Sequence, residues 1–302
     1  MGADGSRNTA RMSDRIVDRP RELLVSGHVI IDRFLSVRSF PEVDRTVPVL
    51  GSRTELGGTA TNIALAASRL GVATGLVSRL GDGFPEEYLG RLRTAGIDVR
   101  GLEFVRGTPT PTCTIVEDRT GAQRTLIDQG AMAEARGAPL PLRWIGEYSW
   151  LHLTTADPSF QLRLQRAARL RGLRVAADPA QEIHYRWDRR SFGTLVRNSE
   201  ILFGNRSEIA RAMEFLSTRS PEGLLEFVPL VVQTEGRKGA SAFSRAGTFH
   251  VKARRPTRVR TLVGAGDAFR GGFYAGWFAG QALPDCLVAG TRSAARWIEG
   301  RR

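Results

Sequence analysis

Cysteine is nearly absent from this chain, which holds only Cys113 and Cys286 among its 302 residues. These two lie far apart and match no metal-ligand spacing, so neither a zinc module nor a disulfide-rich scaffold is predicted. No apolar run approaches the roughly 20 residues that a membrane-spanning helix needs. Residues 1–20 are polar and lack the apolar segment of a signal peptide, and we expect a disordered tail there. The sequence therefore predicts a cytoplasmic protein with no membrane partner.

Lysine is also scarce, because 42 of the 44 basic residues are arginine and the formal net charge is +13. Most arginines are spread through presumed helices rather than gathered in blocks. This pattern favours solvated surfaces over a nucleic-acid-binding arm, and no nucleic-acid partner is expected. One denser patch, residues 252–260, precedes a glycine-rich loop and could steer an anionic nucleotide towards it.

Several common catalytic motifs are missing as well. The sequence has no Walker A lysine loop, and Gly27-His28-Val29 stands where a dinucleotide-binding G-x-G-x-x-G turn would follow the first apolar run. The second absence argues against a dinucleotide-dependent oxidoreductase. The histidines form no metal-ligand cluster. His152 lies in an apolar run and is interpreted as a core residue whose hydrogen bonds are satisfied.

Strand-like and helix-like segments alternate along most of the chain. This order predicts an α/β fold with a largely parallel sheet covered by helices on both faces. Segments 33–55 and 104–132 resemble short strands of a separate small sheet, a lid that would keep water from a reactive group. Because ligands collect at the carboxyl edge of such sheets, we expect Asp32, Asn205, Thr234 and Gly264 to share that edge.

The stretch from Thr261 to Phe273 carries the strongest chemical signal. Gly264-Ala265-Gly266 exposes backbone N–H groups at the start of a helix predicted from Asp267 onward. A helix N-terminus favours an anion, and Asp267 could accept the proton of an attacking alcohol. Phosphoryl transfer to a hydroxyl needs this combination. On these residues alone, an ordinary glycine loop with an Asp cap is an equally good interpretation.

A second polar constellation lies earlier in the chain. Gly57-Gly58 forms a turn before a helix over 63–70, so Asn62 falls in the first helical turn. A side-chain amide both donates and accepts, which suits a hydroxyl-rich ligand. Asp32 is predicted at the carboxyl end of the first strand, although alone it would be interpreted as a turn or cap residue.

Together these segments resemble the PfkB family of carbohydrate kinases, which includes ribokinase-like and adenosine kinase-like enzymes. The resemblance runs from about residue 23 to the end and implies a ribokinase-like three-layer α/β/α fold with a small β lid. It rests on matches, in order, to Gly57-Gly58-x-x-x-Asn62, Asn205-x-x-Glu208, Thr234-x-Gly236-x-x-Gly239 and Gly264-Ala265-Gly266-Asp267.

The resemblance implies ATP-dependent phosphorylation of a primary hydroxyl on a sugar or nucleoside, with a pentose-containing acceptor favoured. It also implies Mg²⁺, held by Glu208 through water, and a homodimer through the lid. Asp267 would be the catalytic base, with Gly264, Ala265 and Gly266 as the anion hole. The acceptor would contact Asp32, Gly57, Gly58 and Asn62, and the nucleotide would contact Asn205, Glu208, Thr234, Gly236 and Gly239.

The family usually has Asp-Thr where Thr261-Leu262 stands, which weakens the case for a monovalent-cation site.

Two alternatives to this function stay open. A hexose or sugar phosphate could replace the pentose as acceptor. A protein of the same fold that binds sugar or nucleotide with impaired catalysis is the second alternative.

Overall fold

The computed structural model describes residues 21–133 and 135–300, and the tail predicted for residues 1–20 lies outside this range. The strands are β1 (Arg21–Ser26), β2 (Ile30–Val37), β3 (Val49–Gly57), β4 (Thr74–Asp82), β5 (Asp98–Pro109), β6 (Thr112–Glu117), β7 (Gln123–Asp128), β8 (Tyr148–Leu153), β9 (Arg174–Ala177), β10 (Ile201–Asn205), β11 (Leu230–Thr234), β12 (Ala240–Ser244) and β13 (Gly247–Val251). The helices are α1 (Thr59–Ser68), α2 (Glu86–Thr94), α3 (Pro158–Arg169), α4 (Arg189–Arg197), α5 (Arg206–Leu216), α6 (Ala265–Phe278) and α7 (Leu283–Ile298).

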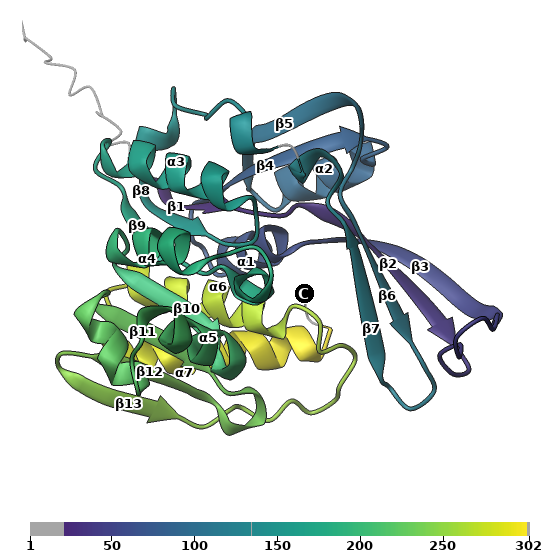
Figure 1. The fold of residues 1–302 in the computed structure, drawn as a ribbon. Helices are drawn as coiled ribbons and strands as arrows, with labels where there is room; N and C mark the ends of the chain where they lie inside the picture. Colours follow the sequence, from purple (N-terminus) through teal and green to yellow (C-terminus); the bar gives the residue numbers. More distant parts are fainter. Residues whose placement is uncertain (1–20, 134, 301–302) are drawn as a thin grey trace, which may run out of the picture.

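Within the described residues these strands form two sheets. The larger has nine strands in the order β13-β12-β11-β10-β9-β8-β1-β4-β5, and the smaller has four in the order β3-β2-β6-β7. Helices cover both faces of the larger sheet, and the smaller sheet projects from one side (Figure 1). The predicted three-layer α/β fold with a small β-sheet lid is confirmed.

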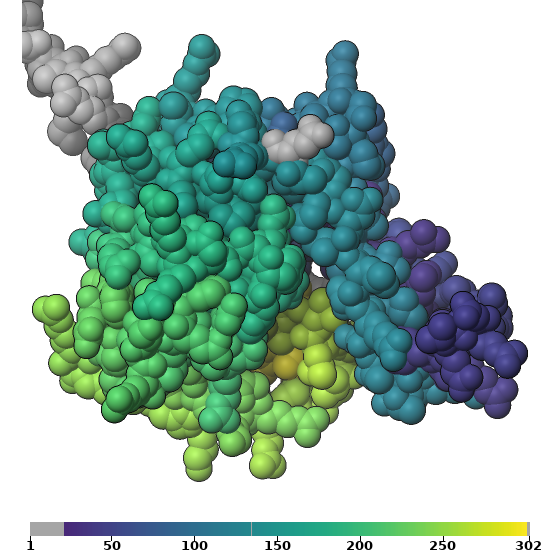
Figure 2. Space-filling model, in the orientation of Figure 1, coloured from purple at the N-terminus to yellow at the C-terminus, as the bar shows by residue number. Residues whose placement is uncertain are grey.

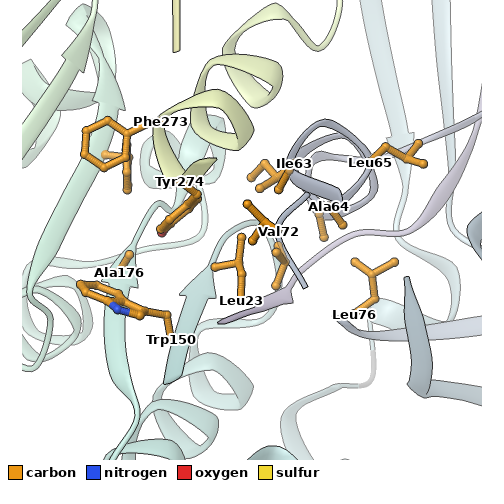
Figure 3. Packing of buried hydrophobic residues seen from close by; sticks show 14 of the residues in the cluster. Leu23, Ile63, Ala64, Leu65, Val72, Leu76, Trp150, Ala176, Phe273 and Tyr274 are labelled. Carbon is orange, nitrogen blue, oxygen red and sulfur yellow. The ribbon is translucent and has the colours of Figure 1, made fainter. Parts of the chain in front are cut away.

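Strand β1 shows how the sequence builds the layers. Leu23, Leu24 and Val25 are each 0% exposed, as expected of a central strand covered on both faces. Leu23 and Val25 pack in the cluster that includes α1, α6 and α7, whereas Leu24 packs with α3, α4 and α5. Figure 3 shows the first cluster, in which Phe273 and Tyr274 of α6 lie above the sheet.

The strands from β5 across to β11 pair in parallel, and only β12 and β13 among the described strands of this sheet run antiparallel to their neighbours. The carboxyl ends of the parallel strands therefore share one edge. Loops after these strands converge there, which positions the candidate site.

The lid differs from its predicted boundaries. Its strands cover residues 30–57 and 112–128, while residues 98–109 belong to β5 and pair with β4 in the large sheet. Asp32 lies on lid strand β2, not at the carboxyl end of β1, because β1 ends at Ser26 and the chain turns before pairing with β3. The strand predicted for Asp32 was therefore wrong, although its side chain still lines the site.

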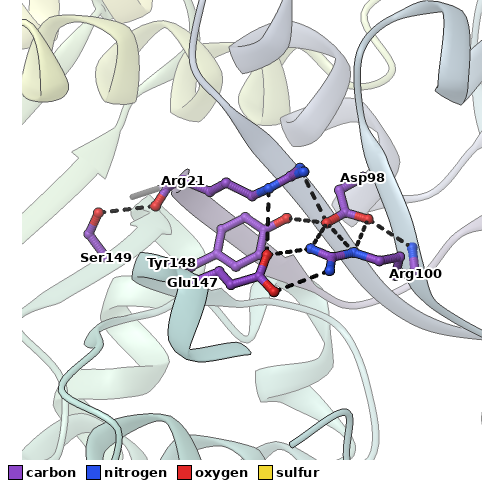
Figure 4. A network of polar contacts seen from close by, with 6 residues as sticks. All are labelled: Arg21, Asp98, Arg100, Glu147, Tyr148 and Ser149. Atoms are coloured by element: carbon purple, nitrogen blue, oxygen red, sulfur yellow. Dashed lines mark hydrogen bonds and ion pairs between the residues drawn. The ribbon is translucent and has the colours of Figure 1, made fainter. Parts of the chain in front are cut away.

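A polar network lies at the edge of the sheet opposite the carboxyl ends, at the starts of β1, β5 and β8 (Figure 4). Asp98 accepts hydrogen bonds from Arg100 at 2.7 Å and from the Tyr148 hydroxyl at 2.9 Å. Burial alone would raise the pKa of Asp98, but these hydrogen bonds outweigh it and lower the pKa. The network lies at the amino ends of the strands, so it stabilises the body away from the candidate site.

Over the described residues, none of the helices combines the length and the apolar character that crossing a membrane requires.

Candidate active site

A cavity of about 430 Å³ lies between the carboxyl edge of the sheet and the lid. In the space-filling view a hollow lies between the lid strands and the body, and the yellow C-terminal part of the chain is visible in it (Figure 2). The predicted site residues that line the cavity are Asp32, Gly58, Asn62, Asn205, Glu208, Thr234, Gly264, Gly266 and Asp267. The structure thus brings together side chains from both sheets and from the helix that follows the glycine-rich loop.

Four predicted residues lie outside the cavity lining: Gly57, Ala265, Gly236 and Gly239. Gly57 lies behind Asp32, and a Cβ there would stand 2.0 Å from the Asp32 Oδ2 atom. Gly236 and Gly239 flank the short turn after β11, beyond Thr234. Their contribution to a nucleotide site stays a prediction.

Helix α6 begins at Ala265, two residues before its predicted start, and its shape depends on Gly264. Gly264 has φ 79°, a left-handed conformation that glycine adopts without strain. A Cβ there would lie 2.9 Å from the Trp297 indole nitrogen and 3.0 Å from the Asn62 amide nitrogen. The close approach of α1 and α7 to this loop therefore requires glycine.

The backbone N–H groups at the start of α6 are not equivalent. The Ala265 N–H donates to the carbonyl of Leu262 at 3.3 Å, whereas helix geometry leaves the N–H groups of Gly266 and Asp267 without an intrahelical carbonyl. Gly266 and Asp267 also line the cavity. An anion at this helix end would meet the Gly266 and Asp267 amides first, and the predicted role of Ala265 would require release of its bond to Leu262.

Asp267 is held by Asn62, whose side-chain Nδ2 donates to its Oδ2 at 2.9 Å. Burial raises the pKa of Asp267 to about 6, although the Arg270 charge and the Asn62 hydrogen bond lower it. The nearby carboxylates of Asp178 and Glu208 raise it further. Such a carboxylate is ionised at neutral pH and still basic enough to accept a proton in catalysis.

Asn205 and Glu208 form a reciprocal cap at the start of α5. The Glu208 N–H donates to Asn205 Oδ1 at 3.0 Å, and the Asn205 N–H donates to Glu208 Oε2 at 2.7 Å. This arrangement is a capping box, which fixes where the helix begins. Burial raises the pKa of Glu208, opposed by the charge of Arg270. The pair therefore has a structural role, and it also presents carboxylate and amide oxygens to the cavity.

One buried network was missed by the sequence analysis. Arg270 lines the cavity, is 4% exposed, and forms a bidentate ion pair with Asp178, which is 0% exposed and follows β9. His152 contacts the Asp178 Oδ2 atom at 3.1 Å and the Tyr274 hydroxyl at 2.8 Å. The interpretation of His152 as a satisfied core histidine is confirmed. The sequence offered one signal for Arg270, because it is a basic residue among the buried aromatic residues of α6.

Another part of the cavity lining contains His28, whose position next to Gly27 suggested a place near the site, and Glu182, which the motifs did not assign. His28, which is 2% exposed, contacts the Gln129 side chain at 2.7 Å, and burial lowers the His28 pKa to about 4. Glu182 is 0% exposed, its nearest charged partner is Arg186 at 3.5 Å, and burial raises its pKa to about 7. The lid contributes apolar side chains to this part of the cavity, namely Ile30, Cys113, Ile115 and Ile127.

The arrangement defines a class of protein. A lidded cavity at the carboxyl edge of a parallel sheet, with a carboxylate at a helix N-terminus, suits transfer of an anionic group to a small acceptor. Residues 20–301 match the model of the pfkB family carbohydrate kinases, and the chain belongs to this family.

Known proteins with similar sequence or structure carry related names. The chain is 34% identical over 268 residues to a nucleoside kinase of Methanothermobacter thermautotrophicus, covering 88% of this chain and 85% of that protein. It is 29% identical to a cytidine kinase of Thermococcus kodakarensis, covering 90% and 94%. The structure is similar to that of Methanocaldococcus jannaschii nucleoside kinase, described as an archaeal member of the ribokinase family, with TM-score 0.86, 26% identity and 92% of each chain covered.

Proposed function

We propose that this protein uses ATP to phosphorylate the primary hydroxyl group of a nucleoside. The observation that carries the proposal is the carboxylate of Asp267, oriented by Asn62 and placed at the first turn of α6 inside the lidded cavity. Two of the sequence relatives described above are named as kinases of nucleosides, which supports the same acceptor class.

The chemical step follows from this arrangement. Asp267 accepts the proton of the acceptor hydroxyl as its oxygen forms a bond to the γ-phosphorus of ATP. The bond between that phosphorus and the bridging oxygen of the β-phosphate breaks, and ADP leaves. Charge on the transferred group is taken up by backbone N–H groups at the start of α6.

The binding roles are proposed by position. Asp32, Gly57, Gly58 and Asn62 would hold the sugar hydroxyls, close to Asp267. Asn205, Glu208, Thr234, Gly236 and Gly239 would bind the nucleotide on the side of α5 and β11. Thr234 and Asn205 are register partners on neighbouring parallel strands, so both reach this side of the cavity together.

The cavity favours a nucleoside over a free pentose. Apolar lid side chains, including Ile115 and Ile127, line it on one side, and they would cover the flat face of a nucleobase. A free sugar is smaller and hydroxylated on all sides, so it would leave this apolar wall in contact with water. Because a sugar without a base would not cover the apolar wall, a hexose or sugar-phosphate kinase ranks second to a nucleoside kinase.

Magnesium fits the nucleotide side of the cavity. Glu208 and Asn205 offer carboxylate and amide oxygens, the donor atoms that Mg²⁺ prefers, and several carboxylates there are balanced by one guanidinium. Glu208 and Asn205 would hold the ion, and its positive charge would offset the negative charge of the nucleotide phosphates. Among the described residues no group of three or more His, Cys, Asp or Glu side chains is placed to hold a metal ion.

Two finer proposals concern the protein's surroundings. Lid residues Val49, Leu50 and Leu126 are 51%, 56% and 63% exposed, and this apolar surface supports a homodimer through the lid. Both cysteines are free and buried, which supports a reducing, cytoplasmic location. Light scattering tests the dimer, and a monomeric mass across the working concentration range would contradict it.

The decisive experiment measures ADP release with ATP and Mg²⁺ across adenosine, cytidine, guanosine, inosine, uridine, ribose and fructose. We expect turnover with at least one nucleoside and a loss of about 100-fold or more in Asp267→Asn, because the amide cannot accept the proton. ATP-induced thermal stabilisation should survive in the variant.

Two results would redirect the proposal. Turnover with fructose or ribose alone would favour a sugar kinase. No turnover with any acceptor, combined with a melting temperature that ATP still raises, would favour the binding protein with impaired catalysis.

A further inference from the structure

Arg270 lies one helical turn after the start of α6, and its side chain points back towards that start. Its Nη1 donates to the carbonyl oxygen of Gly266 at 3.0 Å. A Cβ on Gly266 would lie 3.1 Å from the same Nη1 atom, so glycine lets the guanidinium approach the backbone closely. The Gly266 carbonyl belongs to the peptide unit that carries the Asp267 N–H. Arg270 therefore touches the part of the helix that would receive the transferred group.

The guanidinium is held rigidly from its other side. Asp178 accepts from Nε and Nη2 in a bidentate pair, which fixes both the position and the plane of the guanidinium. Asp178 is fixed in turn by His152, whose Nε2 must donate because a carboxylate only accepts. The Tyr274 hydroxyl then donates to Nδ1 of His152. Strands β8 and β9 thus anchor Arg270 against the same helix that carries it.

Arg270 also stands out by charge. Among the residues that line the cavity, the carboxylates are Asp32, Glu182, Glu208 and Asp267, and the basic side chains are Arg270 and His28. The low pKa of His28 leaves it neutral at physiological pH. A nucleotide brings further negative charge, and a fixed cation in the cavity lining would offset part of that charge.

We propose that Arg270 is a positioning residue for phosphoryl transfer, which rests on the kinase activity proposed above. It fixes the first turn of α6 by holding the Gly266 carbonyl, and Asp178 keeps it in place. Its charge balances the carboxylates around the transferred group. A buried ion pair that served stability alone would leave the chemical step unchanged when replaced by a neutral pair of similar size.

The test compares three variants of the full chain. Arg270→Lys keeps a positive charge but loses the bidentate pair and the contact with Gly266. The double variant Asp178→Asn/Arg270→Met removes both charges, so it leaves no unpaired buried ion. Tyr274→Phe is the matched control, because it perturbs the same network through His152 while leaving Arg270 and Asp178 in contact.

We expect kcat of Arg270→Lys to fall about 10-fold or more and that of the double variant about 100-fold or more, since misplaced catalytic groups carry costs of this size. The KM values for ATP and the acceptor should change by less than about threefold in Arg270→Lys, as for an interaction made in the transition state. Tyr274→Phe should keep kcat within about threefold of the unaltered protein, because the Arg270 geometry is intact.

Thermal stability gives a readout independent of turnover. ADP with Mg²⁺ and aluminium fluoride mimics the transferred phosphoryl group, and it should raise the melting temperature more than ADP with Mg²⁺ alone. We expect this additional increase in the unaltered protein and in Tyr274→Phe. It should be absent from both Arg270 variants.

The outcomes separate the inference from the proposed function. Normal kcat and a retained additional increase in both Arg270 variants would overturn the role of Arg270 while leaving the kinase activity standing. Failure of both variants to fold would assign the pair to stability alone and would also overturn it. No turnover of the unaltered protein with any acceptor would overturn the proposed function, and the inference with it.

Discussion

The side chain of Asp267 must be ionised to accept a proton, and its pKa of about 6 sets the pH range in which it can do so. We expect kcat/KM to be constant above neutrality and to fall about tenfold per pH unit below pH 6, as the carboxylate becomes protonated. Asn62 donates to Asp267 and lowers its pKa, so Asn62→Ala should move this acidic limb to higher pH. An unchanged limb in Asn62→Ala would count against Asp267 as the titrating base.

Glu182 makes a second pH-dependent prediction at the scale of one side chain. Its folded pKa of about 7 lies above its ordinary value of 4.5 because of burial. The folded state therefore holds the proton more tightly than the unfolded chain, and stability falls as the pH rises from 4.5 to 7. The full effect is about 3 kcal/mol, from the shift in pKa.

Glu182→Gln lacks this titration. The free energy of unfolding of the variant, relative to that of the unaltered protein, should therefore increase from pH 5 to pH 7. Chemical denaturation at both pH values measures the difference. The same change at Glu86, whose side chain is 80% exposed, is the control and should show no such trend. An advantage for Glu182→Gln that does not grow with pH would show that the carboxylate is not desolvated as the structure indicates.

Two helices offer a matched pair of caps at the scale of the secondary-structure element. Asn205 caps α5 beside the cavity, and Asp188 caps α4 with the same reciprocal capping box away from it. Replacing either residue with alanine should cost about 1 kcal/mol of stability, because each leaves helix N–H groups without a partner. Only Asn205→Ala should also raise the KM for ATP, if the pair binds the nucleotide as proposed.

Denaturation and steady-state kinetics of both variants measure the two effects. Equal stability losses with unchanged KM values would reduce Asn205 and Glu208 to a structural cap. The comparison is informative because the two bonds of the capping box, with the bond from Asn205 Nδ2 to Glu208 Oε1, account for the contacts between these residues without a ligand.

Local patterns in the sequence predicted most elements, because burial periodicity and glycine stops are local properties. Gly71 and Gly96, both at positive φ, follow the ends of α1 and α2 within three residues, although α1 covers residues 59–68 and not the expected 63–70. Asp32 was misplaced because only Ser26, Gly27 and His28 separate two short apolar segments, and sheet pairing assigns these segments to different sheets, β1 to the large one and β2 to the lid. Periodicity does not record which sheet a strand joins.

The same contrast between local sequence patterns and long-range contacts applies to the candidate site. Motif spacing predicted Asp267, Asn62 and the glycine-rich loop, since these residues belong to short contiguous segments. The pair of Arg270 and Asp178 joins residues 92 positions apart, and the partners of Glu182 likewise come from several elements. Such contacts depend on how helices pack on the sheet, which a single sequence does not specify.

At the scale of the whole molecule, the net charge of +13 must act on any anionic substrate. Lys252, Arg254 and Arg255 are exposed in the segment between β13 and α6, which leads into the glycine-rich loop. Such a patch attracts nucleotide phosphates from a distance. Salt weakens this attraction, because the Debye length is only about 10 Å at 0.1 M ionic strength. We therefore expect kcat/KM for ATP to fall as ionic strength rises from 0.02 to 0.5 M, a range chosen to span this screening.

The same patch provides the control. Arg254→Ser/Arg255→Ser removes exposed charge without touching the cavity lining, so kcat at saturating ATP should stay the same. The kcat/KM for ATP should drop at low salt and approach that of the unaltered protein at high salt, since screening removes the contribution that the variant lacks. Parallel salt curves for the two proteins would show that the patch does not steer the nucleotide. The arginines would then act only as a solvated surface, and the binding of ATP would depend on groups inside the cavity alone.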